Sequence, residues 1–346
     1  MPQRSRRRPR LDPSVLGAEL RDALLHLDVT LTDLAGGEGA PEGFDPRRFL
    51  APGVPRVRPL LVLLSARAAT QGDAPVGRPD AATEHVAVAA ELLHLAIVLH
   101  DAALGRQGGR RRRAARRLIS RGVGVLAGNH VTLRALELTR HTPAPEIVGD
   151  LVEAMREVAD GHAVAQALQG RIPSVEDAVL LGEMRSGAVF SFACRAGGRL
   201  AGADRRVVTA LGRYGRHTGL AWHLAEDLAS LDDLDDGHEP SGNSLEDRAI
   251  EGRPGYCLSL AATRDPDLQA LWRELARDPD PELARRIASV VRDTGAPSDA
   301  RARLARECWA ARSALQQLSP SPNRDLLDQI VGTLAWDGRD QPSGQP

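Results

Sequence analysis

The chain has 346 residues, of which 42% are hydrophobic and only 3% aromatic, and its formal net charge is −1. This length is sufficient for one large domain with a dry core, or for two small ones. A composition built on Ala, Leu and Val favours helices over a β-sandwich, which uses more aromatic residues. With almost no net charge, the chain as a whole has no field that would attract nucleic acid or a membrane surface.

The sequence contains no lysine, because all 45 positions counted as Lys or Arg are Arg, and this excludes functions that need a lysine amine. The cysteines Cys194, Cys257 and Cys308 are odd in number and lack metal-ligand spacing, which predicts reduced thiols. No apolar run reaches the roughly 18 residues of a membrane-spanning helix, and the basic N-terminus is not followed by a signal-type core. We therefore expect a cytoplasmic protein without a membrane span.

Apolar residues at helical spacing run through most of the chain between about residues 11 and 335. The clearest predicted helices cover residues 59–69, 81–104, 120–139, 147–168, 175–201, 204–231 and 281–294. Gly, Pro and Asp break the pattern at 36–43, 71–79, 141–145, 237–243 and 319–322. The sequence therefore predicts a single-domain, all-α helical bundle over residues 11–335, between a disordered basic tail at 1–10 and a second disordered tail at 336–346.

Two short motifs lie near the ends of two of these predicted helices. Residues 99–104 read Leu-His-Asp-Ala-Ala-Leu, and residues 225–230 read Ala-Glu-Asp-Leu-Ala-Ser. They resemble the two aspartate-rich motifs of the trans-polyprenyl diphosphate synthase (polyprenyl synthetase) family. Residues 53–59 and 91–94 resemble that family in order and spacing as well. The resemblance covers about residues 53–255 and implies a helical bundle of the isoprenoid synthase type.

In an intact motif, carboxylates at i and i+4 share one face of a helix, and two such helices hold the Mg²⁺ ions that bind a diphosphate. The ions neutralise the leaving group as an allylic carbon–oxygen bond breaks. The resemblance implies that Asp101, Glu226 and Asp227 are the catalytic and metal-binding residues here. Three positions where the family has a carboxylate carry other residues, namely Ala102, Gly105 and Ser230. We therefore expect a weakened site that holds fewer Mg²⁺ ions; without the resemblance, Asp101 is more typical of a surface or capping residue.

A second set of residues corresponds to the diphosphate-binding side of the family site. Residues 53–59 resemble a Gly-Gly-Lys-Arg-x-Arg-Pro segment that binds isopentenyl diphosphate, with Pro55 in place of the lysine. Residues 185–186 resemble a Lys-Thr pair, and residues 252–255 resemble Gly-Lys-Pro-Thr. The resemblance implies five residues that bind substrate diphosphate: Arg56, Arg58, His94, Arg185 and Arg253. A lone helix histidine is more often a buried core residue than a ligand, but His94 lies seven residues before Asp101 and so on about the same face.

Two charged runs allow more than one interpretation. Residues 106–117 are rich in arginine where the family closes an Arg-Arg-Gly segment over the diphosphate, so clustered guanidiniums would replace some metal charge. The alternative is a solvated basic loop, and the lack of interleaved aromatic residues argues against nucleic acid. The acidic run at 232–236 is either a helix end that opens into a solvated loop or a displaced metal site.

Three functions are compatible with these residues. The first is a divergent member of isoprenoid metabolism that binds a prenyl diphosphate and transfers it to isopentenyl diphosphate with residual Mg²⁺ chemistry. The second is a terpene-synthase-like cyclase of one prenyl diphosphate, which would not need the lysine that Pro55 replaces. The third is a non-catalytic subunit. Family members pair through a helical interface, so we expect a homodimer or a heteromer with an active homologue.

Overall fold

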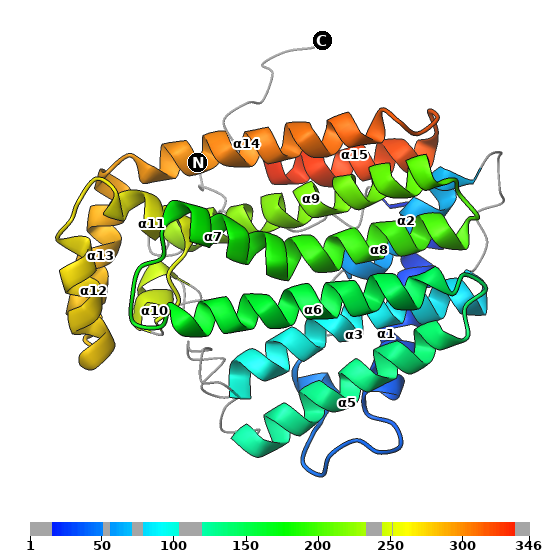
Figure 1. Cartoon of the computed structure of the whole chain (residues 1–346), viewed down its shortest axis with the longest axis horizontal. Helices are drawn as coiled ribbons and strands as arrows, with labels where there is room; N and C mark the ends of the chain where they lie inside the picture. Colours follow the sequence, from blue (N-terminus) through cyan, green and yellow to red (C-terminus); the bar gives the residue numbers. More distant parts are fainter. Residues whose placement is uncertain are drawn as a thin grey trace.

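The computed structural model describes residues 16–50, 56–70, 79–103, 120–232, 244–250 and 252–335. Throughout these residues the regular elements are helices, so the predicted all-α helical bundle is confirmed (Figure 1). The tails at 1–10 and 336–346 and the arginine run at 106–117 lie outside the described residues, as do Pro55, Gly105 and most of the acidic run. Their predicted roles stay predictions.

The longer helices of the bundle are α1 (Ala18–Ala35), α2 (Val57–Ala69), α3 (Ala81–Ala103), α5 (Arg121–Arg140), α6 (Glu146–Ala167), α8 (Ala188–Leu200), α9 (Arg205–Asp232), α12 (Leu268–Arg277), α13 (Pro281–Asp293), α14 (Ala296–Leu315) and α15 (Pro322–Ala335). Shorter elements are the 3₁₀ turn η2 (Pro46–Arg48), α7 (Val175–Gly182), the π turn η3 (Glu183–Gly187), α10 (Leu245–Ile250) and α11 (Tyr256–Ala262). The helix predicted over 175–201 is thus divided into α7, η3 and α8.

Several helices begin where a side chain can cap the first turn. Ser120 and Ser174 accept hydrogen bonds from the backbone N–H of Val123 and Asp177, at the starts of α5 and α7. Asp280 caps α13, and Pro281 follows at the first helical position, where its missing N–H has no intrahelical partner to lose. These caps explain why the local sequence sets the helix starts.

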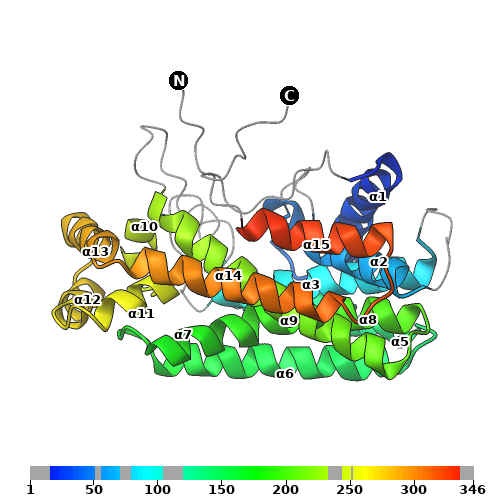
Figure 2. The ribbon, with the colours of Figure 1, turned by 90° about the horizontal axis from the view of Figure 1, so that it is seen from above.

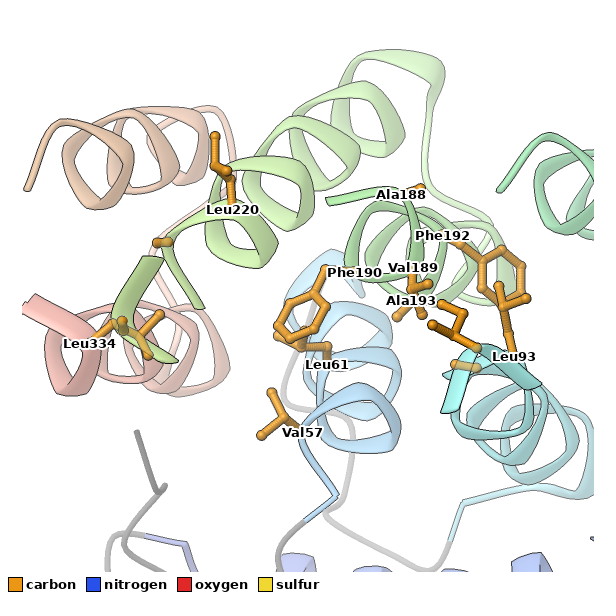
Figure 3. Packing of buried hydrophobic residues seen from close by; sticks show 14 of the residues in the cluster. Val57, Leu61, Leu93, Ala188, Val189, Phe190, Phe192, Ala193, Leu220 and Leu334 are labelled. Atoms are coloured by element: carbon orange, nitrogen blue, oxygen red, sulfur yellow. The ribbon is translucent and has the colours of Figure 1, made fainter. Parts of the chain in front are cut away.

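Helix α8 lies in the middle of the bundle, where it packs against α2, α3, α6 and α9. Phe190 and Phe192 are two residues apart on α8 and therefore point to different neighbours. Figure 3 shows Phe190 beside Leu61 of α2 and Phe192 beside Leu93 of α3. The helices α10 to α13 gather at one end of the bundle in both views (Figures 1 and 2).

Helix α3 is the one helix in the described part of the chain that is long and apolar enough to cross a membrane. This corrects the expectation that no stretch would pass that test. Its most apolar window has a mean hydropathy of 1.6, and 78% of that window is buried inside the structure. Such burial is what a central helix of a protein core shows.

Close approach of α9 to its neighbours depends on two glycines one turn apart. A Cβ atom on Gly215 would lie 2.4 Å from the carbonyl oxygen of Phe190, and one on Gly219 would lie 2.5 Å from that of Ser186. Neither backbone oxygen can move aside as a flexible side chain would. The pair therefore permits α9 to lie directly on α8 and on the π turn.

We predict that Gly215→Ala destabilises the protein by about 1–3 kcal/mol, because the added methyl group forces the two helices apart. The matched control is Gly149→Ala, since a Cβ on this helical residue of α6 would meet nothing within 4 Å. That change should stabilise the protein by about 0.5–1 kcal/mol. Urea unfolding measures both, and equal effects of the two variants would contradict the close approach.

Candidate functional site

The two motifs lie near the C-terminal ends of α3 and α9, and the π turn η3 lies near both. Asp101 is on α3, Glu226 and Asp227 are on α9, and Arg185 is on η3, which packs against α6 and α9. A π turn widens the helix by one residue and is frequent at functional sites. Here it places Arg185 next to the first motif.

The carboxylate of Asp101 is held by two side chains from other elements. Arg185 forms an ion pair with its Oδ2, and the Nε2 of His162 on α6 lies 3.2 Å from its Oδ1. Burial would raise the pKa of Asp101, but the charge of Arg185 and the hydrogen bond with His162 more than reverse this, so the pKa lies well below its usual value. Asp101 is therefore ionised at neutral pH, and both of its oxygens have partners.

Arg56 and Arg58 lie beside His94 but are themselves paired with acidic residues. The Nε of Arg56 lies 2.8 Å from Asp28, and an Nη of Arg58 lies 3.3 Å from Glu91. The guanidinium of Arg58 also stacks over a core aromatic ring, Phe190, at 5.3 Å from its centroid. These contacts fix the orientation of both arginines at the edge of the core.

Burial lowers the pKa of His94 well below its usual value, and the charges of Arg58, Arg185 and Arg56 lower it further. The charge of Asp101 raises the pKa of His94, but this does not offset the lowering by burial and by the three arginines. The ring is therefore neutral at pH 7 and offers one N–H donor and one acceptor. The structure thus places His94 within the electrostatic reach of Arg56, Arg58 and Arg185; their role in binding a diphosphate stays a prediction.

Asp227 is only 1% exposed; its Oδ2 is hydrogen-bonded, whereas its Oδ1 lies next to a cation but has no hydrogen-bond partner among the described residues. Oδ1 forms an ion pair of 2.8 Å with Arg248 of α10, and Oδ2 accepts a hydrogen bond of 2.8 Å from the backbone N–H of Cys257. A Cβ on Gly255 would lie 1.8 Å from Oδ1, so only glycine fits against this carboxylate. Asp227 therefore joins α9 to α10 and to the segment before α11.

Ser230 stands at the last position of the second motif and belongs to the same cluster. Its Oγ donates a hydrogen bond of 2.6 Å to the carbonyl oxygen of Asp227 and accepts one of 3.4 Å from Arg248. The predicted ligand Glu226 is partly buried on the same helix. Arg253 is partly buried after α10, where its backbone N–H donates to the carbonyl oxygen of Arg248 at 2.9 Å.

His223 connects the two halves of the site electrostatically. Burial lowers the pKa of His223, and the charges of Arg248 and Arg185 lower it further, while Asp227 and Glu226 oppose them. Arg185 therefore lies within electrostatic reach of both His94 and His223.

The residues present do not fit the Mg²⁺ cluster that the resemblance implies. Mg²⁺ requires several oxygen ligands in octahedral geometry, whereas Asp101 and Asp227 are each engaged by an arginine. In the ranges that the structure describes, no three His, Cys, Asp or Glu side chains are placed to hold one ion. The metal-binding role of Asp101, Glu226 and Asp227 stays a prediction, and we derive no catalytic step through Mg²⁺.

Two residues of the site, His162 and Arg248, carry no signal in the sequence. His162 belongs to α6, and its spacing from Asp101 carries no motif. Arg248 is one arginine among many in a chain without lysine. Only the packing of α10 on the end of α9 distinguishes it, so a sequence pattern had no means of finding it.

We predict that the free energy of unfolding falls as the pH drops from 7 to 5, in part because of His94. Its pKa is lowered in the folded state, so the unfolded chain takes up the proton first, near pH 6.5, and this stability is lost as the pH falls below that value. His94→Gln should reduce the slope of the unfolding free energy against pH, by at most about 1.4 kcal/mol per pH unit.

Urea titrations at pH 7 and pH 5 measure this effect, with His141→Gln as the control because His141 is exposed. An unchanged slope in His94→Gln would show that the ring is not buried in its neutral form. Because burial also lowers the pKa of His100 and His223, we expect the slope to become smaller and not to vanish.

Comparison with known proteins identifies the family to which the chain belongs. The family model described as polyprenyl synthetase matches residues 47–293. The chain is 28% identical over 277 residues to octaprenyl diphosphate synthase of Escherichia coli, which covers 79% of this chain and 82% of that protein. It is 25% identical over 307 residues to geranylgeranyl pyrophosphate synthase of Geoglobus acetivorans, and the match covers 86% of this chain and 92% of that protein.

Solved structures share the fold. A decaprenyl diphosphate synthase from Rhodobacter capsulatus matches with a TM-score of 0.78 at 24% identity, covering 94% of this chain and 98% of that one. A polyprenyl synthase from Caulobacter crescentus, complexed with calcium and isoprenyl diphosphate, matches with a TM-score of 0.78 at 24% identity. The match covers 92% of this chain and 97% of that one. Since the family model covers more than half of the sequence, the chain belongs to the polyprenyl synthetase family, as its motifs predicted.

Proposed function

We propose that this chain binds a prenyl diphosphate with arginine side chains and does not ionise it. The observation that carries the proposal is the contact between Arg185 and Asp101: the cation next to the first motif is part of the protein. Of the three functions compatible with the sequence, this favours the non-catalytic subunit or binder over chain elongation and cyclisation, both of which begin with ionisation.

The choice of ligand class is supported by the family and by the activities for which its members are named. The relatives reported above are named as prenyl diphosphate synthases, and the Caulobacter crescentus structure is described as a complex with isoprenyl diphosphate. This chain retains the arginine and histidine residues that correspond to the diphosphate-binding side. We therefore propose a prenyl diphosphate as its ligand.

Arg185 is suited to hold a diphosphate while it stays paired with Asp101. A guanidinium has five N–H donors in a fixed plane, and the pairing with Asp101 uses only some of them. Because Asp101 and His162 restrain the group before a ligand arrives, less conformational entropy is lost on binding. The neutral ring of His94 adds one hydrogen-bond donor nearby.

The apolar surface of α5 supports the proposal that the chain works as part of an oligomer. Leu126 and Leu133 are seven residues apart on this helix and are 58% and 59% exposed. Leu25 and Val29 of α1, a helix that contacts α5, are each 60% exposed. Exposed apolar side chains at helical spacing are typical of a surface that another helical subunit covers. A homodimer or a heteromer with an active homologue, in the cytoplasm, stays our proposal.

Calorimetric titration with a non-hydrolysable farnesyl diphosphate analogue tests the proposed function, first with Mg²⁺ and then with EDTA. We expect the same affinity in both buffers. Arg185→Ala should weaken binding by about 1.5–3 kcal/mol, the range for a hydrogen bond to a charged group, which is roughly 10- to 150-fold. Arg312→Ala is the control, since Arg312 pairs with Asp328 on the surface of α14 and α15.

Two results would contradict the proposal. Binding that disappears in EDTA would show that the surviving carboxylates still use a metal ion, and assays for elongated and cyclised products would then separate the other two functions. An Arg185→Ala variant that binds as well as the unchanged protein would remove Arg185 from the site.

A further inference from the structure

The geometry points to Arg248 as an internal cation that takes the place of a divalent metal ion at the second motif. In this arrangement its guanidinium forms an ion pair with the carboxylate of Asp227, and this pair prevents Mg²⁺ from binding there. The inference deepens the proposed function, on which it rests for the identity of the ligand. It concerns a residue that the motif resemblance does not include.

Arg248 contacts the second motif at two positions. One of its terminal nitrogens lies 2.8 Å from Oδ1 of Asp227 and donates a hydrogen bond of 3.4 Å to Oγ of Ser230. These residues are three positions apart on α9, so they lie on one face of the helix. The positive charge is therefore placed against the side of the motif on which a metal ion would need its ligands.

Arg248 and Asp227 are both buried, so water screens the attraction between their charges only weakly. The side chain of Arg248 is 11% exposed and that of Asp227 is 1% exposed. Removing one partner of a buried ion pair leaves an uncompensated charge, which is strongly unfavourable. A divalent cation next to the guanidinium would be strongly repelled, because like charges are poorly screened in a buried site. The arginine and the metal ion therefore exclude each other.

The position of Arg248 is fixed by the packing of α10. Arg292 of α13 bonds to Glu246 of α10 at 2.9 Å and donates to the carbonyl oxygen of Leu231 at 3.3 Å. Ser244 accepts a hydrogen bond of 3.1 Å from the backbone N–H of Asp247 at the start of α10. These contacts join α10 to the end of α9, so Arg248 is presented to the motif by a restrained element.

Arg248 also has an unsatisfied donor at this site. In the part of the chain that the structure describes, its Nε is buried and has no hydrogen-bond acceptor, and the nearby Oδ1 of Asp227 likewise has no hydrogen-bond donor. A buried donor without a partner is unfavourable, and an anionic oxygen would satisfy it. Since a guanidinium stays charged throughout the accessible pH range, the cation would be present whatever the pH or the magnesium concentration.

The test is a titration with MnCl₂ alone, because Mn²⁺ reports by electron paramagnetic resonance on sites that Mg²⁺ would use. Arg248→Met removes the charge and keeps an unbranched apolar side chain. We expect the unchanged protein to show no specific Mn²⁺ binding. Arg248→Met should bind Mn²⁺ about tenfold or more above any background, with the freed carboxylate of Asp227 as a protein ligand and water molecules as the others. The melting temperature of the variant should rise with Mn²⁺, because the ion neutralises Asp227.

Two further variants serve as controls. Arg248→Lys keeps the positive charge and should gain no site. The double variant Asp227→Asn with Arg248→Met should lose the site that the single variant gained. If Arg248→Met does not fold, Arg248→Gln removes the charge but keeps a hydrogen-bond donor. Its Mn²⁺ binding is then compared with that of the unchanged protein in the same way.

Equal Mn²⁺ affinity in the unchanged protein and in Arg248→Met would overturn the inference, as would a folded variant that gains no site. The titration with Mn²⁺ contains no prenyl ligand, so its failure is distinguishable from failure of the proposed function. Conversely, absence of binding to the farnesyl diphosphate analogue would overturn that function and leave the assignment of Arg248 unchanged.

Discussion

Two pairs of arginine and carboxylate, one buried and one partly buried, join separate helices at the two motifs. Arg185 pairs with Asp101 and joins the π turn to α3, while Arg248 pairs with Asp227 and joins α10 to α9. Buried ion pairs contribute little net stability, because desolvation offsets the attraction, but breaking one is strongly unfavourable. They therefore act mainly to specify one arrangement of these elements.

The same pairs explain why a site with carboxylates in the family positions does not fit a metal cluster. A carboxylate binds Mg²⁺ when its lone pairs face solvent or a second ligand. Oδ1 of Asp227 instead lies next to the positive charge of Arg248, and Oδ2 accepts a hydrogen bond from the backbone N–H of Cys257. Gly255 completes the enclosure because its missing Cβ leaves just enough space for the carboxylate. Retention of an aspartate at a motif position is thus compatible with a structural role.

The rest of the bundle supplies the rigidity that such pairs require. Gly215 and Gly219 let α9 lie against α8 and the π turn, which brings the backbone of Arg185 and that of the second motif close together. On the other side, Phe190 of α8 supports the guanidinium of Arg58. The charged residues therefore lie on a packed aliphatic and aromatic core, and their orientation follows from that packing.

The sequence by itself determined the helical character and the family, because periodicity and motif spacing are local or nearly local properties; the binding roles of His94, Arg56, Arg58 and Arg185 stay predictions. It also determined which carboxylates are absent, since Ala102 and Ser230 can be read directly. The tertiary structure alone decided which partners the remaining carboxylates have. Asp101 and His162 are 61 residues apart, and Cys257 is 30 residues from Asp227. No spacing rule relates residues on different helices, so only the packing of those helices could show that arginine, and not an open set of oxygen ligands, faces each motif.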